Sequence, residues 1–204
     1  MIFGFDLDNT IVCYDKLFKK VALEEELIPN NLYPFKDSIK NYLINNNKEK
    51  EWTILQGKVY GARVSEAEVY EGIKEVFKLL TSRNISIYII SHKTKYPFLG
   101  EKINLHKSAL SWLENKNFFN DTLINLSKKN VFFEESKDKK IKRIINLNCN
   151  FYIDDLIEIL EKLPNKINKF LFSPLNKEIS INNINIVNKI NNWKNFLRVI
   201  NNIV

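Results

Sequence analysis

Residues 3–12, with the sequence FGFDLDNTIV, run from an apolar strand into a polar turn. In a parallel sheet the strand interiors are buried on both faces, and ligands gather at the carboxyl ends of the strands, where Asp6 and Asp8 fall. Because side chains two apart along a strand share a face, we expect both carboxylates to point into one small volume. Crowded carboxylates are costly without a cation or a proton between them. The pair therefore predicts a Mg²⁺ ion and one carboxyl group that carries a proton, although the same residue types also form ordinary turns.

The length and composition indicate an ordinary globular protein. The chain has 204 residues, of which 45% are hydrophobic and 27% are charged, so it fits one domain or one domain with a small insertion. The net charge of +7 favours anionic substrates, which include phosphates and nucleic acid. Nucleic acid is the less favoured of the two, because the basic residues are spread along the chain and form no long run interleaved with aromatic residues.

The cysteines and the hydropathy pattern bear on the cellular setting. Cys13 and Cys149 are far apart in the sequence and show no CxxC spacing, so we interpret both as free thiols. The first strand begins at once, and no apolar run approaches the roughly 20 residues of a membrane span. We therefore expect a cytoplasmic protein without a membrane segment.

Strand and helix patterns alternate along the chain. Apolar spacing predicts helices at 14–28, 36–46, 70–80, 103–114, 137–147, 156–163 and 187–203, and strands at 85–90, 131–133, 151–153 and 169–172. Such alternation is typical of a parallel sheet covered by helices on both faces. We expect a doubly wound α/β core formed by residues 1–13 and 71–204, with residues 14–70 as a small, mostly helical insertion.

The segment from Asp6 to Thr10, DLDNT, resembles the first motif, DxDx[TV], of the haloacid dehalogenase (HAD) superfamily of phosphohydrolases. The resemblance implies that Asp6 is a nucleophile that forms an aspartyl-phosphate and that Asp8 is the general acid and base. It also implies a Rossmann-like core. The position of residues 14–70, between the first and second motifs, is similar to that of the family's C1 cap, which closes over the substrate.

Two further motifs of the family have counterparts in this chain. Ser91 directly follows the apolar strand 85–90, as in the second motif, and would hydrogen-bond a phosphoryl oxygen, although a Ser at this place can also cap a helix or form a turn. The third motif is a lysine near the start of a helix, where its charge offsets that of the nucleophile and the phosphate. We assign it to Lys140, with Lys137 as the reserve, and interpret most of the neighbouring lysines as a solvated basic face.

The fourth motif is an apolar strand followed by acidic residues, and Asp154 and Asp155 follow the strand 151–153. By resemblance the Mg²⁺ ligands are Asp6, the main-chain oxygen of Asp8, and Asp154, with Asp155 close by through water or a hydrogen bond. Carboxylates, a carbonyl and a phosphate oxygen form the kind of oxygen donor set that Mg²⁺ requires. Glu158 either adds to this acidic cluster or is an ordinary acidic residue in the first turn of a helix.

The remaining polar residues near these strand ends are candidates for substrate binding. We assign Thr10, His92 and Lys93 to this role, with the alternative that His92 is a loop histidine exposed to water. His106 is interpreted as a surface residue.

The resemblance predicts a Mg²⁺-dependent phosphatase that hydrolyses a small phosphorylated metabolite in two steps through an aspartyl-phosphate. A dehalogenase is less favoured, because such enzymes need neither a carboxylate at the position of Asp8 nor a metal. A phosphomutase, a nucleic-acid end phosphatase and a phosphate-binding regulatory protein without turnover stay open as alternatives. The sequence leaves the substrate and the oligomeric state undetermined.

Overall fold

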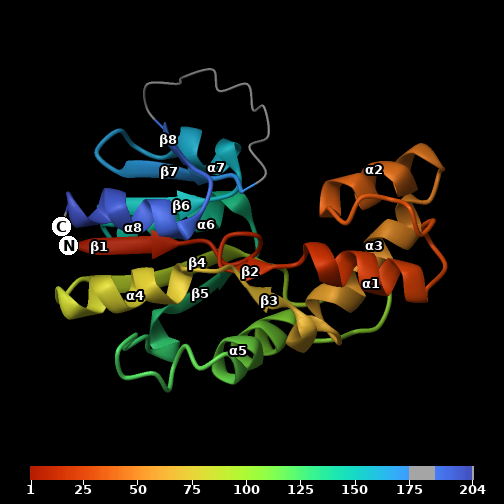
Figure 1. Ribbon diagram of the computed structural model, residues 1–204, viewed down its shortest axis with the longest axis horizontal. Helices are drawn as coiled ribbons and strands as arrows, with labels where there is room; N and C mark the ends of the chain where they lie inside the picture. Colours follow the sequence, from red (N-terminus) through yellow and green to blue (C-terminus); the bar gives the residue numbers. More distant parts are fainter. Residues whose placement is uncertain (175–186, 204) are drawn as a thin grey trace. The chain divides into compact units, whose positions relative to one another are not determined.

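The computed structural model describes residues 1–174 and 187–203 (Figure 1). The chain packs into two compact units. The core unit comprises Met1–Val12, Val69–Lys93 and Asn117–Val204, and the insert unit comprises Cys13–Glu68 and Thr94–Lys116. The chain leaves the core unit at β2 (Val12–Cys13) and returns to it at β3 (Glu68–Val69), and these two short strands pair with each other. Strands of two residues are too short to show a periodicity, so the sequence pattern did not predict them.

The core unit contains a six-stranded parallel sheet in the order β5-β4-β1-β6-β7-β8. Its strands are β1 (Ile2–Phe5), β4 (Ser86–His92), β5 (Val131–Glu134), β6 (Phe151–Asp154), β7 (Asn168–Phe172) and β8 (Val187–Ile190). The predicted α/β class with a doubly wound parallel sheet is confirmed. Because β1 lies between β4 and β6, the polar residues after these three strands are brought to the same edge of the sheet.

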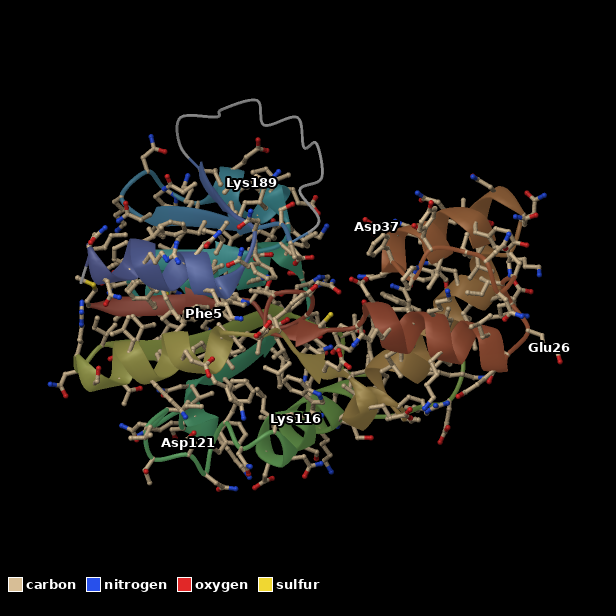
Figure 2. All side chains as sticks on the ribbon, in the orientation of Figure 1. Phe5, Glu26, Asp37, Lys116, Asp121 and Lys189 are labelled. Atoms are coloured by element: carbon tan, nitrogen blue, oxygen red, sulfur yellow. The ribbon has the colours of Figure 1, made fainter. Side chains whose placement is uncertain are left out.

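Helices α4 (Ile73–Ser82) and α8 (Trp193–Asn201) contact each other and cover one face of the sheet (Figure 1). This face is aromatic. Phe5 of β1 packs against Phe77 of α4 and Trp193 of α8, with ring centroids 4.9 and 5.9 Å apart. Figure 2 labels Phe5 within this layer, and Lys189 on the exposed edge strand β8. The indole Nε1 of Trp193 also donates a hydrogen bond of 3.2 Å to the carbonyl of Thr10, so α8 supports the polar turn after β1.

Helices α6 (Lys137–Asn146) and α7 (Ile157–Lys162) cover the opposite face. Ile144 of α6 and Ile159 of α7 belong to one apolar cluster with Tyr152 of β6. Tyr152 is fully buried, and its hydroxyl donates a hydrogen bond of 2.6 Å to the carbonyl of Ile90 in β4. Since β1 lies between β6 and β4, the Tyr152 side chain crosses β1, where Gly4 is its neighbour in register.

The closing helix predicted at 187–203 is wrong in its first part. Residues Val187–Ile190 form the edge strand β8, and α8 begins only at Trp193. Val187 and Ile190 are buried and three residues apart, a spacing that fits a helix as well as a strand. Pairing with β7 decides the outcome, and tertiary pairing of this kind regularly overrides local pattern.

The insert unit is helical. It contains α1 (Asp15–Glu24), α2 (Lys36–Asn45), α3 (Glu49–Tyr60), the short 3₁₀ helix η1 (Val64–Glu66) and α5 (Leu105–Asn115). Phe18 of α1 stacks on Trp52 of α3 with centroids 5.2 Å apart, and the indole of Trp112 in α5 donates a buried hydrogen bond of 3.0 Å to the Ala67 carbonyl. Figure 2 labels Glu26 and Asp37, two exposed acidic residues of this unit.

The compact units and the domain boundaries predicted from the sequence differ by one or two residues at each end of the insertion and by one longer segment. The prediction placed only residues 14–70 in the insertion, whereas residues 94–116, with α5, pack with the insert unit. The apolar stripe of α5 showed that the helix buries one face, and it did not show which partner that face contacts. Within residues 1–174 and 187–203, no helix combines the length and the apolar character that a membrane span requires.

Gly4→Ala is expected to destabilise the core unit by about 1–3 kcal/mol, because overpacking forces side chains out of their favoured positions. A Cβ atom at position 4 would lie 2.6 Å from Cδ2 of Tyr152 and 3.1 Å from Sγ of Cys149. Urea unfolding measures the change, with Ser86→Ala at the exposed start of β4 as the control. A second substitution, Tyr152→Leu, should recover part of the loss. Equal stability of Gly4→Ala and wild type would contradict the close packing.

Candidate active site

Asp6 and Asp154 lie at the ends of adjacent strands and on the same side of the sheet. The backbone N–H of Asp6 donates a hydrogen bond of 2.9 Å to the carbonyl of Ile153, which continues the pairing of β1 with β6. Gly4 and Tyr152 are in register, so Asp6 and Asp154, two residues further along each strand, share the face that α6 and α7 cover. Carboxylate oxygens of Asp6, Asp154 and Asp155 all lie within 4.8 Å of one another. The structure thus brings together acidic residues that are almost 150 positions apart in the sequence.

Lys140 occupies the space between these carboxylates. It extends from the first turn of α6, which Ser136 caps by accepting a hydrogen bond from the Lys139 N–H. Its Nζ lies 2.6 Å from Oδ1 of Asp6 and 2.7 Å from Oδ2 of Asp154, and its side chain is only 1% exposed. Buried lysines are rare unless they are paired, and this one faces two carboxylates.

Lys137, the reserve choice for the motif lysine, is placed differently. Its side chain is 41% exposed, and its Nζ pairs with Oε1 of Glu158 at 2.5 Å. The structure therefore places Lys140 among the buried carboxylates and Lys137 in a pair on the surface. Glu158 is exposed as well, and it accepts a hydrogen bond from Lys137.

Burial controls the ionisation of Asp6, which directly follows β1. Loss of hydration raises the pKa of Asp6 from 3.8 to about 7, although the Lys140 ammonium lowers it; the charges of Asp154 and Asp8 raise it further. Burial also lowers the pKa of Lys140, but the charges of Asp154 and Asp6 outweigh this effect and hold its pKa above the ordinary value. Without a metal, the cluster therefore carries a cationic lysine and an Asp6 carboxyl group that titrates near neutral pH.

Asp8 forms an ion pair with a different lysine, Lys93. The Nζ of Lys93 lies 2.7 Å from Oδ2 of Asp8, and the two side chains are 4% and 17% exposed. Lys93 was assigned to substrate binding from the sequence, and in the structure its ammonium faces the second aspartate of the DLDNT segment. The two aspartates of that segment therefore have different cationic partners, Lys140 for Asp6 and Lys93 for Asp8.

Two buried hydroxyl groups are available to a ligand. Oγ1 of Thr10 and Oγ of Ser91 are both inaccessible to solvent and have no hydrogen-bond partner among the described residues. A buried hydroxyl without a partner costs free energy, and such groups are usually explained by an ion, a water molecule or a ligand. Both residues were assigned to the site from the sequence, and the orphaned hydroxyls fit a role in holding a phosphoryl oxygen.

Ser91→Ala should therefore separate activity from stability. Removing a buried hydroxyl that has no partner is expected to leave the free energy of unfolding unchanged or raise it by up to about 1 kcal/mol. For the phosphatase activity that the sequence resemblance predicts, loss of one hydrogen-bond donor to a phosphoryl oxygen is expected to lower turnover by about 10–100-fold. Urea unfolding and steady-state kinetics measure the two effects. A Ser91→Ala protein that is markedly less stable than wild type would show that the hydroxyl has a structural partner.

Asn9 contributes to the site, and the sequence interpretation did not assign it a role. It has a left-handed backbone with φ of 58°, which Asn tolerates better than most residues. Its Nδ2 donates a hydrogen bond of 3.4 Å to Oδ2 of Asp155. An Asn in a tight polar turn is the sequence signal for such a backbone, but the contact with Asp155 depends on the arrangement of the strands and could not be inferred from it.

The histidines and cysteines are only peripheral to this cluster. His92 is partly buried, and burial together with the charges of Lys140 and Lys137 lowers its pKa. His106, interpreted from the sequence as a surface residue, is partly buried on α5. Cys13 and Cys149 are not joined in a disulfide, as expected, and burial raises the pKa of Cys149 to about 12.

The donor set fits Mg²⁺. Asp6, Asp154 and Asp155 supply carboxylate oxygens, which are the ligands that this ion prefers. Oδ2 of Asp154 is buried and has no hydrogen-bond partner of good geometry within residues 1–174 and 187–203, although the Lys140 ammonium lies 2.7 Å away. A cation could bind at this oxygen beside Lys140, and the metal-ligand role of Asp154 stays a prediction.

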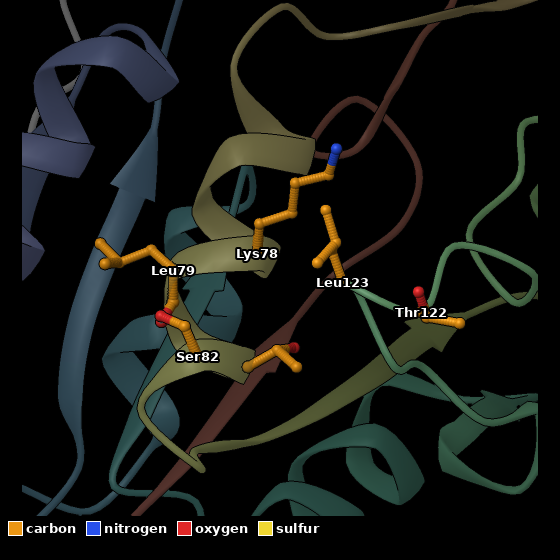
Figure 3. Close-up of a pocket in the computed structure, with 6 residues that line it drawn as sticks. Lys78, Leu79, Ser82, Thr122 and Leu123 are labelled. Atoms are coloured by element: carbon orange, nitrogen blue, oxygen red, sulfur yellow. The ribbon is translucent and has the colours of Figure 1, made fainter.

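A separate hollow of about 400 Å³ lies on the core unit between α4 and the loop that follows α5 (Figure 3). It is lined by Lys78, Leu79, Thr81, Ser82, Thr122 and Leu123. The last turns of α4 lead into the amino end of β4, so this hollow lies toward the edge of the sheet opposite the carboxylate cluster. Its one lining cation, Lys78, pairs with Asp121 at 3.3 Å. The hollow therefore adds no group to the candidate active site.

Solved structures that are described as HAD hydrolases share this architecture. A protein described as the HAD-hydrolase YfnB from Bacillus subtilis, solved bound to magnesium, superposes with a TM-score of 0.63 at 13% identity, covering 98% of each chain. A HAD-superfamily hydrolase from Ehrlichia chaffeensis gives a TM-score of 0.55 at 16% identity, covering 98% of this chain and 96% of that chain. A protein described as a β-phosphoglucomutase from Thermotoga maritima gives 0.54 at 12% identity, covering 100% and 99%. No protein-family model and no curated protein matches the sequence. The chain therefore has the fold of the HAD-superfamily hydrolases.

Proposed function

We propose that this protein is a Mg²⁺-dependent phosphatase that hydrolyses a small phosphomonoester through an aspartyl-phosphate on Asp6. The observation that carries the proposal is the cluster at the ends of β1 and β6, where Lys140 lies between Asp6 and Asp154 with Asp155 close by. It combines a nucleophilic carboxylate, a buried cation and an oxygen donor set for a metal. The HAD-hydrolase fold is consistent with this chemistry, and a magnesium-bound neighbour supports the choice of ion.

Each residue of the cluster has a defined role in the proposed reaction. Asp6 attacks phosphorus, while Lys140 and the hydroxyl of Ser91 stabilise charge on the phosphoryl oxygens. Asp8 protonates the leaving alcohol and then accepts a proton from the water that hydrolyses the aspartyl-phosphate. Mg²⁺, held by Asp6, Asp154, Asp155 and the main chain at Asp8, would supply further charge stabilisation. Positioning and charge stabilisation thus account for most of the rate.

A screen of phosphorylated metabolites, each with and without Mg²⁺, tests the activity, with Asp6→Asn as the control. Release of inorganic phosphate that requires both Mg²⁺ and Asp6 supports the proposal. With a sugar phosphate as substrate, product analysis separates hydrolysis from a phosphomutase reaction, which would retain the phosphoryl group on the sugar. Turnover of a haloacid without metal would instead indicate a dehalogenase, a reaction that Asp8 and Asp154 do not favour.

Two other functions are kept as outcomes of the same screen. A nucleic-acid end phosphatase is motivated by the net charge of +7, and its activity on oligonucleotide ends would fall steeply with added salt. A regulatory protein that binds phosphate would show binding without turnover. The small-molecule phosphatase is preferred, because no catalytic residue of the four motifs is missing from the chain.

The affinity for Mg²⁺ is expected to depend on pH. Burial raises the pKa of Asp6 to about 7, so below that pH the carboxyl group must lose a proton before it can bind the metal. The affinity should therefore rise about tenfold per pH unit below pH 7 and level off above it. Calorimetric titration with MgCl₂ in buffers of different ionisation enthalpy measures the proton release, which should approach one at pH 6 and fall toward zero at pH 8. Asp6→Asn should show no such release, and a pH-independent wild-type affinity would contradict the expectation.

A further inference from the structure

We infer that Lys93 is a positioning residue that orients the Asp8 carboxylate for proton transfer, and that it acts through Asp8 rather than by binding the substrate phosphate. The inference rests on the proposed phosphatase function, in which Asp8 gives and takes the proton. It replaces the substrate-binding role that the sequence pattern indicated for Lys93.

The backbone fixes where the Lys93 side chain begins. Lys93 is the first residue after β4, and its N–H donates a hydrogen bond of 2.9 Å to the carbonyl of Glu134, which extends the pairing of β4 with β5. Because side chains alternate along an extended segment, Lys93 shares a face with Ser91, whereas His92 points to the other face. The pKa of His92 is affected by burial, by the charges of Lys140 and Lys137 on α6 and also by the charge of Asp8, so His92 lies near both parts of the site.

The contact with Asp8 is short and buried. Lys93 Nζ lies 2.7 Å from Oδ2 of Asp8, a distance typical of a charge-assisted hydrogen bond. The Lys93 side chain is 4% exposed, so water screens this pair much less than it screens a pair on the surface. A carboxylate held at one oxygen by a buried cation loses rotational freedom about its Cβ–Cγ bond. Lys93 therefore restricts the orientation of the group that must transfer the proton.

The other polar groups of the site show why Lys93 differs from a phosphate ligand. The hydroxyls of Thr10 and Ser91 are buried, and neither has a hydrogen-bond partner in the part of the chain that the structure describes, as expected for groups that bind a ligand. Lys140 faces Asp6 and Asp154, so a cation near the nucleophile is already present. The ammonium of Lys93 faces Asp8 instead. The two lysines thus divide the site into a nucleophile side and a proton-transfer side.

The effect on the reaction follows from where the proton goes. In the first step a bond forms between an Asp6 oxygen and phosphorus, the ester P–O bond breaks, and the proton of Asp8 moves to the leaving alcohol. In the second step water attacks phosphorus and gives a proton to Asp8, and the bond to Asp6 breaks to release inorganic phosphate. A misoriented Asp8 slows the first step most when the leaving group is a poor one, since such a group needs the proton in the transition state.

Lys93→Met tests the inference with two substrates of different leaving group, 4-nitrophenyl phosphate and ethyl phosphate. The rate of formation of the phospho-enzyme is measured with enzyme in excess. The expected loss is about tenfold or more with ethyl phosphate and clearly smaller with 4-nitrophenyl phosphate, with little change in KM for either. Lys93→Arg, which keeps a cation near Asp8, should restore part of the rate. In the Asp8→Asn background, Lys93→Met should cause no further loss.

Equal losses with both substrates, or a further loss in the Asp8→Asn background, would overturn the inference and assign Lys93 to direct phosphate binding. Thermal unfolding of each variant identifies a loss that is due to misfolding, and Lys93→Arg then provides the comparison with a folded protein. A different result would refute the proposed function. If neither the wild-type protein nor Asp6→Asn forms phospho-enzyme with either substrate, the phosphatase proposal itself is refuted, and the role of Lys93 with it.

Discussion

Asp6→Asn is expected to abolish phosphomonoester hydrolysis, with turnover at least about 10³-fold below wild type. An amide oxygen at this position cannot form the aspartyl-phosphate, and no second carboxylate takes the same place at the end of β1. Phosphate release with Mg²⁺ present measures the loss. Asp138→Asn, which makes the same chemical change at an exposed position of α6, is the matched control and should retain full activity.

The Asp6→Asn protein should remain folded. Burial raises the pKa of Asp6 from 3.8 to about 7, so the folded state binds this proton more tightly than the unfolded state does. The stability of the metal-free wild type therefore falls as the pH rises from about 4 to 7. The stability of the variant should not fall in this way, because the asparagine side chain that replaces Asp6 does not titrate. At pH 8 the variant is expected to be at least as stable as the wild type in urea unfolding. A variant that keeps more than about a tenth of the wild-type turnover would refute the nucleophile assignment.

Asp8→Asn tests whether the proposed reaction passes through a covalent intermediate. The nucleophile and the buried lysine stay in place, so the first step can proceed with an activated substrate, but hydrolysis of the intermediate lacks its base. The variant is expected to accumulate phospho-enzyme, which intact mass spectrometry detects as the addition of one phosphoryl group. Absence of the adduct in both Asp8→Asn and wild type, with turnover intact, would argue against a covalent intermediate.

Lys140→Met is expected to impair both folding and activity. It leaves the carboxylates of Asp6 and Asp154 buried beside each other without a cation, and removal of one partner from a buried ion pair typically costs about 3–5 kcal/mol. Activity should fall by at least about 10²-fold, since the phosphoryl charge also loses a stabilising group. Mg²⁺ should recover part of the stability, because the ion offsets the same two carboxylates.

Lys137→Met is the matched control for this substitution. Lys137 lies three residues earlier on the same helix, and its side chain pairs with Glu158 on the surface. Exposed ion pairs contribute little to stability, so urea unfolding and activity should both change only slightly. If Lys137→Met were the more damaging of the two, the assignment of the motif lysine to Lys140 would be wrong.

The alternation of strands and helices predicted most of the core, because buried parallel strands appear as short apolar runs such as residues 85–90. The prediction failed where local pattern is ambiguous. Val187 and Ile190 fit a helix by their spacing, and only pairing with β7 makes them part of a strand. The packing partner of α5 could not be predicted from the sequence either, because an apolar stripe indicates that one face of a helix is buried but not which element covers it.

The residues of the candidate site could be chosen from the sequence because strand ends meet at one edge of a parallel sheet. Lys140 was chosen as the lysine near the start of a helix, and the structure places it between the carboxylates. The pairing of Lys93 with Asp8 could not be predicted in this way. It depends on which way a side chain turns after β4 ends, and a long flexible side chain leaves no record of that direction in the sequence.

The hydrogen bond from Trp193 to the Thr10 carbonyl implies that the last helix is needed for a site to which it gives no reactive group. A chain shortened to end before Trp193 would keep every acidic and basic residue of the cluster. It would nevertheless expose the rings of Phe5 and Phe172, which both pack against Trp193, and it would release the turn that carries Asp8. Such a shortened protein should therefore be catalytically inactive although its sequence retains every residue that the proposed reaction uses.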